Sequence, residues 1–288
     1  MVLKKHRFST LVTLLLLIAI GLSALAISCG STGGAGDKIG VAVSIVPLAD
    51  FVENIGGEEV DVTVMVPPGA SPHTYEPKPS QLVEVSEAEI YVKVGSGVDF
   101  ELAWMDKIIK VNSNMLVLDS SQGIELMGKD PHIWNSPVNA KIMVENICDG
   151  LIQVDPDNAD FYTENMNDYL KELDILDGYI RYKLDRFTDR AFLIYHPAFE
   201  YFASEYGLTQ LAVEHGGKEP TPQVMQDCID KANQYNLQYV FVAPQFATEY
   251  CEAIAREIDG QTASMDPLAE NYIANMGRIA DYLALEFE

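Results

Sequence analysis

The chain has 288 residues, of which 48% are hydrophobic. At about 100–200 residues per domain, this predicts two domains with real cores and excludes a disordered or fibrous protein. The formal net charge of -24 excludes nucleic acid as the main ligand, because an acidic surface repels phosphates, and it raises the local concentration of cations.

The N-terminus has the pattern of an export signal. A basic segment precedes an apolar run at Leu11–Ile20, and a stretch of small residues then ends at Cys29, so residues 1–28 are predicted to be a signal peptide. Cys29 is the predicted lipid-attachment site, with a flexible tether over 29–37. Because Ala26 stands where such sites usually have leucine, an ordinary cleaved signal or a retained membrane helix stays open. Each alternative places the body of the protein outside the cytoplasm.

The first half of the body alternates strand and helix patterns. β-Branched runs predict strands at 40–46, 60–66, 90–94 and 115–119. Amphipathic stretches predict helices at 48–55, 80–88, 100–110 and 138–153. This alternation predicts a parallel sheet flanked by helices, in an N-terminal α/β lobe over 38–154.

A long helix is predicted to connect this lobe to a second one. Apolar residues recur at helical spacing through Leu173, Leu176, Ile180, Leu184 and Phe187. The segment 155–189 is therefore predicted to be a connecting long helix, and about 30 helical residues would span about 45 Å. Strands are then predicted at 191–195, 209–213, 239–243 and 261–265, with helices around 198–206, 222–235, 246–258 and 270–286. The predicted fold is α/β, with two parallel-sheet lobes (38–154 and 190–288) joined by one spine helix.

Four potential metal ligands follow predicted strands. His73, His132 and His196 each neighbour a proline in a loop, and Asp266 follows the last strand. Ligands of parallel α/β sheets bind outside the carboxyl ends of the strands, so two facing sheets would direct these side chains into one cleft between the lobes. Three imidazoles and one carboxylate suit tetrahedral Zn²⁺.

Five segments carry a family resemblance: Pro68–Pro77, Asp130–Trp134, His196–Phe202, Gly217–Pro222 and Met265–Leu268. In sequence and order they resemble the signature stretches of the zinc/manganese solute-binding lipoproteins of ABC importers, the ZnuA-like metal-binding proteins. The resemblance implies two lobes joined by a long helix, with the metal between them held by His73, His132, His196 and Asp266. It further implies a monomer on the outer face of the cytoplasmic membrane, lipid-anchored at Cys29, that delivers metal to a permease with its ATPase.

The third ligand position favours zinc. Manganese binders of this family usually have glutamate where this chain has His196, and imidazole suits Zn²⁺ better than Mn²⁺. A Mn²⁺ or Fe²⁺ binder of the same importer class remains the alternative, as does a surface adhesin or interaction lipoprotein. An enzyme is not expected, because the chain has no H-E-x-x-H motif and a fourth protein ligand would close the coordination shell.

Several further residues lie near these motifs. His215 is either a supplementary ligand or an ordinary loop histidine, and Glu214 and Glu219 are expected to hold an imidazole tautomer from behind. The segment 120–129 lacks histidine, so no auxiliary metal-collecting loop is expected. In an oxidising compartment we expect a Cys228–Cys251 bridge.

Overall fold

The computed structural model describes residues 38–188 and 190–288, and Ile39–Glu288 forms one compact unit. The predicted signal peptide, Cys29 and the tether lie outside the described residues. Among the helices that the structure does describe, none combines the length and apolar character needed to cross a membrane.

The N-terminal sheet has four parallel strands in the order β2-β1-β3-β4. The strands are β1 (Ile39–Ile45), β2 (Val60–Val66), β3 (Ile90–Lys93) and β4 (Leu116–Asp119). The helices of this lobe are α2 (Val46–Gly56), α3 (Pro79–Glu87), α4 (Asp99–Val111) and α5 (Pro137–Val154). From Val41 to Ile45, β1 is buried throughout, because the central strand of a parallel sheet is covered on both faces.

The C-terminal sheet repeats this arrangement with the order β6-β5-β7-β8. Its strands are β5 (Ala191–Ile194), β6 (Thr209–Ala212), β7 (Tyr239–Val242) and β8 (Gln261–Ser264). Its helices are α7 (Glu200–Tyr206), α8 (Pro222–Tyr235), α9 (Glu249–Glu257) and α10 (Tyr272–Phe287). The predicted α/β fold with two parallel sheets is therefore confirmed, and all eight strands lie within one residue of their predicted bounds.

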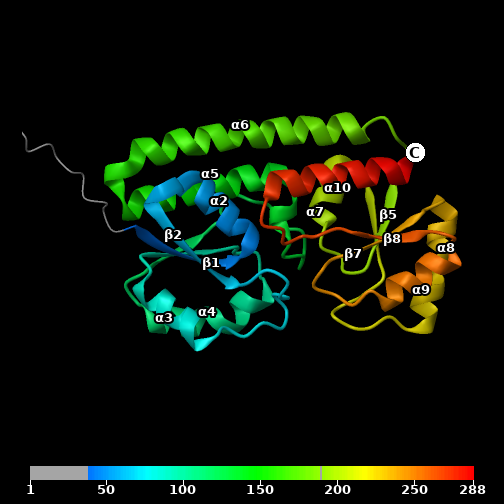
Figure 1. Cartoon of the computed structure of the whole chain (residues 1–288), viewed down its shortest axis with the longest axis horizontal. Coiled ribbons are helices and arrows are strands. Elements are labelled where there is room, and N and C mark those ends of the chain that lie inside the picture. Colours follow the sequence, from blue (N-terminus) through cyan, green and yellow to red (C-terminus); the bar gives the residue numbers. More distant parts are fainter. Residues whose placement is uncertain (1–37, 189) are drawn as a thin grey trace, which may run out of the picture. The chain divides into compact units, whose positions relative to one another are not determined.

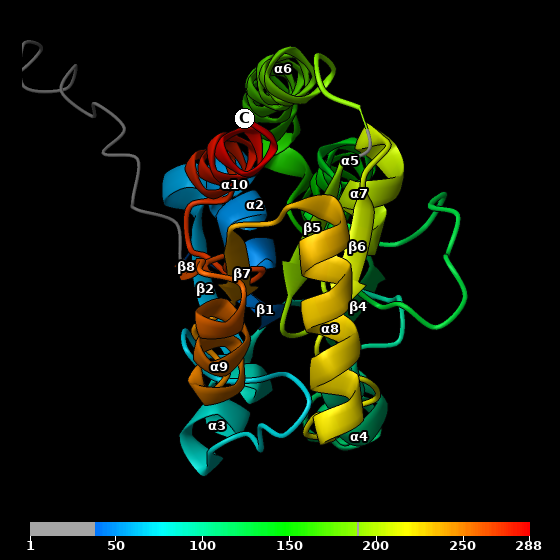
Figure 2. The ribbon, with the colours of Figure 1, turned by 90° about the vertical axis from the view of Figure 1, so that its right-hand side faces the viewer.

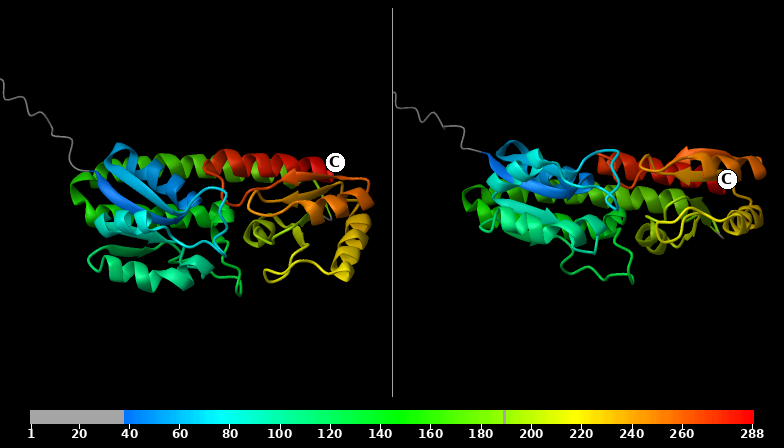
Figure 3. Two further views of the ribbon diagram at one scale, coloured as in Figure 1. Left: turned by 60° about the horizontal axis from the view of Figure 1, so that its bottom comes forward. Right: turned by 90° about the horizontal axis from the view of Figure 1, so that it is seen from below.

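The connecting helix α6 (Ala159–Leu184) has 26 residues, which corresponds to about 39 Å. It is shorter than the predicted segment, because α5 ends at Val154 and Pro156–Asn158 forms a separate 3-10 turn. Figures 1 and 2 show α10 running beside α6, and the two helices are in contact. Both sheets lie on the same side of this helix pair (Figures 1 and 3).

The expected disulfide is wrong. Cys228 and Cys251 are both free and buried, as is Cys148. The Cys228 thiol lies 3.6 Å from the Ala212 carbonyl and the Cys251 thiol 4.0 Å from the Phe241 carbonyl, so each is packed against a different strand of the C-terminal lobe. The oxidising compartment suggested a pair, but Cys228 and Cys251 belong to the apolar core of the C-terminal lobe.

Candidate metal centre

Seven of the eight strands supply a polar side chain to one region at their carboxyl ends. In strand order from β2 to β8, these residues are His73, Asp99, His132, His196, Glu214, Gln245 and Asp266. Because parallel strands end on the same edge of a sheet, loops far apart in the sequence meet there. This topology collects a site from residues spread over most of the chain.

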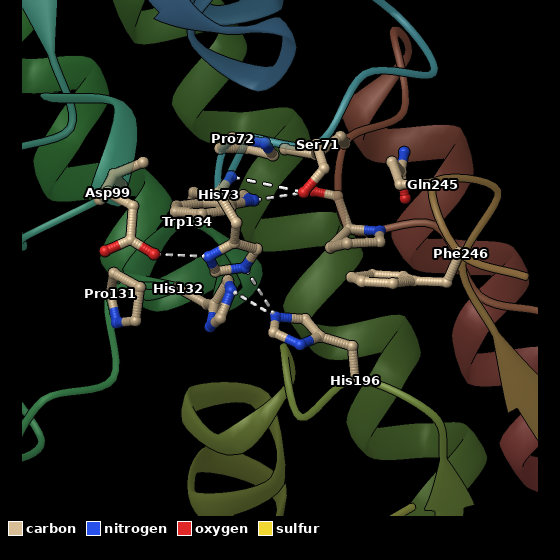
Figure 4. A pocket seen from close by; sticks show the side chains of 13 residues that line it. Ser71, Pro72, His73, Asp99, Pro131, His132, Trp134, His196, Gln245 and Phe246 are labelled. Carbon is tan, nitrogen blue, oxygen red and sulfur yellow. Dashed lines mark hydrogen bonds and ion pairs between the residues drawn. The ribbon is translucent and has the colours of Figure 1, made fainter. Parts of the chain in front are cut away.

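Three imidazoles meet at the centre of this region (Figure 4). The Nε2 atom of His196 lies 3.2 Å from His73 Nε2 and 3.3 Å from His132 Nε2. Among the described residues, these three form the one group of side chains with ligand atoms close enough to share a metal ion. They line a cavity of about 20 Å³, which is the volume of a single water molecule or ion.

Each imidazole is held from behind by a carboxylate. The contacts at Nδ1 are Asp99 Oδ2 to His73 at 2.7 Å, Asp130 Oδ1 to His132 at 2.6 Å, and Glu214 Oε2 to His196 at 2.6 Å. An ionised carboxylate accepts but does not donate, so each Nδ1 carries the proton and each Nε2 presents a lone pair. Three acceptors then face one another, and a cation is the partner that satisfies all of them.

Burial and hydrogen bonds together set the charges of two of these residues. Burial lowers the pKa of His132, although its hydrogen bond to Asp130 acts in the opposite direction, so the neutral, metal-binding form of its ring is favoured. Burial alone would raise the pKa of Glu214, but its hydrogen bonds to His196 and to the Gly217 amide hold that pKa below its usual value. Glu214 is therefore held in its ionised form.

Local backbone structure orients each ring. The turn that carries His73 is closed by Tyr75 N donating to Ser71 O at 3.0 Å. At His132, Asp130 Oδ1 also accepts from the backbone N–H, at 3.0 Å. The His196 ring is stacked on Phe246, with ring centroids 4.9 Å apart.

The fourth expected ligand, Asp266, does not belong to the histidine cluster. Its Oδ1 accepts from Leu268 N at 2.9 Å and from Gln245 Nε2 at 3.0 Å. His215 is exposed and pairs with Lys218 in an isolated bridge, and exposed Glu219 accepts from Tyr250 at 2.8 Å. Neither His215 nor Glu219 lines the cavities at the cluster, as far as the structure describes them.

The sequence analysis missed Asp99, Asp130 and Gln245. Asp130 had a local signal, because an aspartate two residues before a histidine can bind that residue's own backbone and ring. Asp99 had none, since it lies 26 residues from His73 in sequence. Gln245 follows the third strand of the second lobe, the same kind of position that drew attention to the histidines.

Residues 41–285 match the family model described as "Zinc-uptake complex component A periplasmic". The chain belongs to this family. The resemblance predicted from the five motifs is thereby confirmed, and the family's role is that of a transport component and not of an enzyme.

The chain is also similar to relatives that are named for zinc or manganese, and to solved structures. The chain is 26% identical over 262 residues to the high-affinity zinc uptake system protein ZnuA of Bacillus subtilis, covering 83% of this chain and 81% of the relative. It is 33% identical over 253 residues to the manganese-binding lipoprotein MntA of Halalkalibacterium halodurans, with the same coverage of 83% and 81%. A crystal structure of ZnuA superposes with a TM-score of 0.84 at 41% identity, covering 88% of this chain and 100% of that one.

Proposed function

We propose that this protein captures Zn²⁺ outside the cytoplasm and delivers it to the permease of an ABC importer. His73, His132 and His196 bind the ion. The observation that carries the proposal is the set of three Nε2 lone pairs that face one another within 4.8 Å, each fixed by a carboxylate at the opposite ring nitrogen.

Zinc is favoured over manganese by the donor set. Three imidazole nitrogens suit Zn²⁺, whereas Mn²⁺ prefers a shell richer in oxygen. Named relatives include both zinc and manganese proteins, so the likeness to relatives does not choose between the ions. The imidazole at His196, where a carboxylate would favour manganese, supports zinc.

The charges that line the approach to the histidine cluster favour the entry of a cation, whether it is Zn²⁺ or Mn²⁺. An open cleft of about 770 Å³ leads to the histidines, and its described lining includes one lysine, Lys129, against four carboxylates. These carboxylates are those of Asp99, Asp130, Glu200 and Glu214. A cleft lined by one sign of charge concentrates the opposite ion at its mouth, which supports capture from dilute solution.

The location and partners follow from the sequence and the relatives together. Several relatives carry the word lipoprotein in their names, and one from Streptococcus anginosus is named as a manganese ABC transporter substrate-binding lipoprotein. These names support lipid attachment of this chain at Cys29 on the outer face of the cytoplasmic membrane, and a permease with its ATPase as partners. We further propose that the protein acts as a monomer.

Metal content tests the proposal. The full chain is purified in detergent without chelator, and its metals are measured by elemental mass spectrometry beside His196→Ala and the exposed control His215→Ala. We expect one zinc per chain in the wild type and the control, not displaced by excess Mn²⁺, and loss of zinc in His196→Ala. No bound metal, or equal zinc in His196→Ala, would show that the cluster is not the binding site.

A further inference from the structure

Gln245 lies in the wall of the histidine cavity. It follows β7 at the carboxyl end of the C-terminal sheet and lines both the small cavity and the open cleft. Figure 4 shows its side chain across the cavity from Asp99 and next to Phe246, the residue that stacks on His196. An amide group thus lines the cavity that the three imidazoles share, where the carboxylate of Asp266 was expected from the sequence.

The hydrogen bond to Asp266 fixes which way the Gln245 amide points. The Gln245 Nε2 atom lies 3.0 Å from Asp266 Oδ1. Because an ionised carboxylate only accepts, the amide end that faces Asp266 must be the NH₂ group. The carbonyl oxygen, Oε1, is therefore directed away from Asp266.

This carbonyl oxygen is buried and has no hydrogen-bond partner within the described part of the chain. The other buried side-chain atom without a partner in the described part of the chain is Asp130 Oδ2, and Asp130 lines the open cleft. Buried polar atoms are normally paired, so an unpaired acceptor in a binding site indicates a donor supplied by the ligand or its water. Both such atoms lie beside the histidine cluster.

We propose that Gln245 is a positioning residue for the fourth coordination position of the bound ion. Its Oε1 accepts a hydrogen bond from a water molecule that completes the shell of His73, His132 and His196. Asp266 orients Gln245 and does not itself bind the ion. This proposal rests on the proposed zinc-binding function.

The chemistry of the water supports this arrangement. Zn²⁺ polarises a bound water and makes it a strong hydrogen-bond donor, so it needs a nearby acceptor. A neutral amide oxygen supplies that acceptor without adding a charge to the shell. The fourth position is then occupied by a ligand that exchanges with solvent, and delivery of the ion can begin by replacing a water and not by breaking a bond to protein.

The first experiment detects the water directly. The full chain in detergent is loaded with Co²⁺, which replaces Zn²⁺ in such sites and is paramagnetic, and its electron paramagnetic resonance is recorded in ordinary water and in water enriched in the magnetic isotope of oxygen. We expect line broadening in the enriched water for the wild type and for Asp266→Asn. A stoichiometric Co²⁺ complex without broadening would overturn the proposal and leave the zinc-binding function intact, whereas failure to bind Co²⁺ or Zn²⁺ would contradict the function itself.

The second experiment tests whether Asp266 acts through Gln245. Zinc affinity is measured by competition with a chromophoric chelator for Gln245→Leu, Asp266→Asn and the double variant. Loss of a residue that supports a metal ligand typically weakens affinity about 10–100-fold, so we expect that range for Gln245→Leu and no further loss in the double variant. Additive losses, or a much larger loss for Asp266→Asn than for Gln245→Leu, would identify Asp266 as a direct ligand.

A matched control separates this effect from general loss of a glutamine. Gln226 on α8 donates to the Asp230 carboxylate at 2.9 Å, and both residues are exposed. Gln226→Leu should keep wild-type zinc affinity. If Gln245→Leu fails to fold, Gln245→Glu retains the size of the side chain and its acceptor oxygens while losing the donor to Asp266, and it should retain the isotope broadening.

Discussion

Glu214 differs from the other two carboxylates at the cluster in its burial. Its side chain is 4% exposed, compared with 16% for Asp130 and 59% for Asp99. An interaction with a buried charge is screened less by solvent than one with an exposed charge. Glu214 should therefore hold its histidine more strongly than Asp99 does.

Glu214→Gln should weaken zinc binding about 10–100-fold, because the neutral amide holds His196 less firmly in the tautomer that binds the ion. Chelator competition measures this change. The control is Glu219→Gln in the same loop, where the exposed side chain contacts Tyr250 and not the cluster. Equal affinities of the two variants would contradict the role given to Glu214.

The metal-free protein should lose stability as the pH falls below about 6.5, the ordinary pKa of histidine. Burial lowers the pKa of His132 in the folded state, so the unfolded chain takes up a proton at a pH where folded His132 does not. The contribution to the slope is at most about 1.4 kcal/mol per pH unit. Urea unfolding at several pH values measures it, and His132→Gln should show a smaller slope than the wild type.

The residues of the site were unequally predictable. His73, His132 and His196 could be found because each follows a strand, and the topology of parallel sheets turns that position into proximity. Asp266 satisfies the same rule, yet its carboxylate is engaged by Gln245 and Leu268. Such hydrogen bonds depend on how two loops pack against each other. The spacing of residues in the sequence does not reveal that packing.

At the scale of elements, the loop that carries His132 is bonded to the C-terminal lobe. The loop donates three hydrogen bonds to that lobe, from Met127 N to Tyr201 at 2.7 Å, from Trp134 Nε1 to Pro267 O at 2.7 Å, and from Asn135 Nδ2 to Ala198 O at 2.8 Å. It accepts two more, from the Tyr201 hydroxyl at Asp130 O (3.3 Å) and from the Tyr272 hydroxyl at Trp134 O (2.8 Å). The His73 turn is instead closed by its own Ser71, and the His73 side chain is 33% exposed. His132 and His196 thus form the more constrained pair, and His73 is the proposed ligand best placed to move.

Trp134→Phe should lower the free energy of unfolding by about 1–3 kcal/mol, since it leaves the buried Pro267 carbonyl without its donor while keeping an aromatic ring in the core. Denaturant unfolding of the metal-free protein measures this loss. The partly exposed Trp104, whose ring contacts Lys107, supplies the control Trp104→Phe. If Trp134→Phe loses no more stability than Trp104→Phe, the hydrogen bond from Trp134 to Pro267 contributes little to the free energy of unfolding.

The strands were predicted more reliably than the start of the connecting helix or the pairing of the cysteines. Short apolar strands such as β5, with four buried residues, and β7, with three, stand out as apolar runs bounded by turns. The start of α6 did not, because Asp155 and Pro156 fit both a helix start and a separate turn. Cysteine pairing depends on the distance between sulfur atoms, which the spacing of Cys228 and Cys251 does not determine.

At the scale of the molecule, α6 and the bonds around Trp134 oppose wide opening of the lobes. A continuous helix of 26 residues resists bending, and α10 packs along it. We expect zinc binding to change the radius of gyration by less than about 1 Å. Small-angle X-ray scattering of the metal-free and zinc-loaded protein measures this, and a change of several ångströms would require a hinge within α6.

The separation of the three histidines along the chain affects when the protein can hold its ion. His73 and His196 are 123 residues apart in sequence, and they meet only after both sheets have formed. A chain that leaves the cytoplasm unfolded, as the predicted signal peptide implies, therefore carries no assembled chelating site during secretion. Zinc would be acquired only after folding on the far side of the membrane, so that synthesis of the protein does not drain the cell's internal zinc.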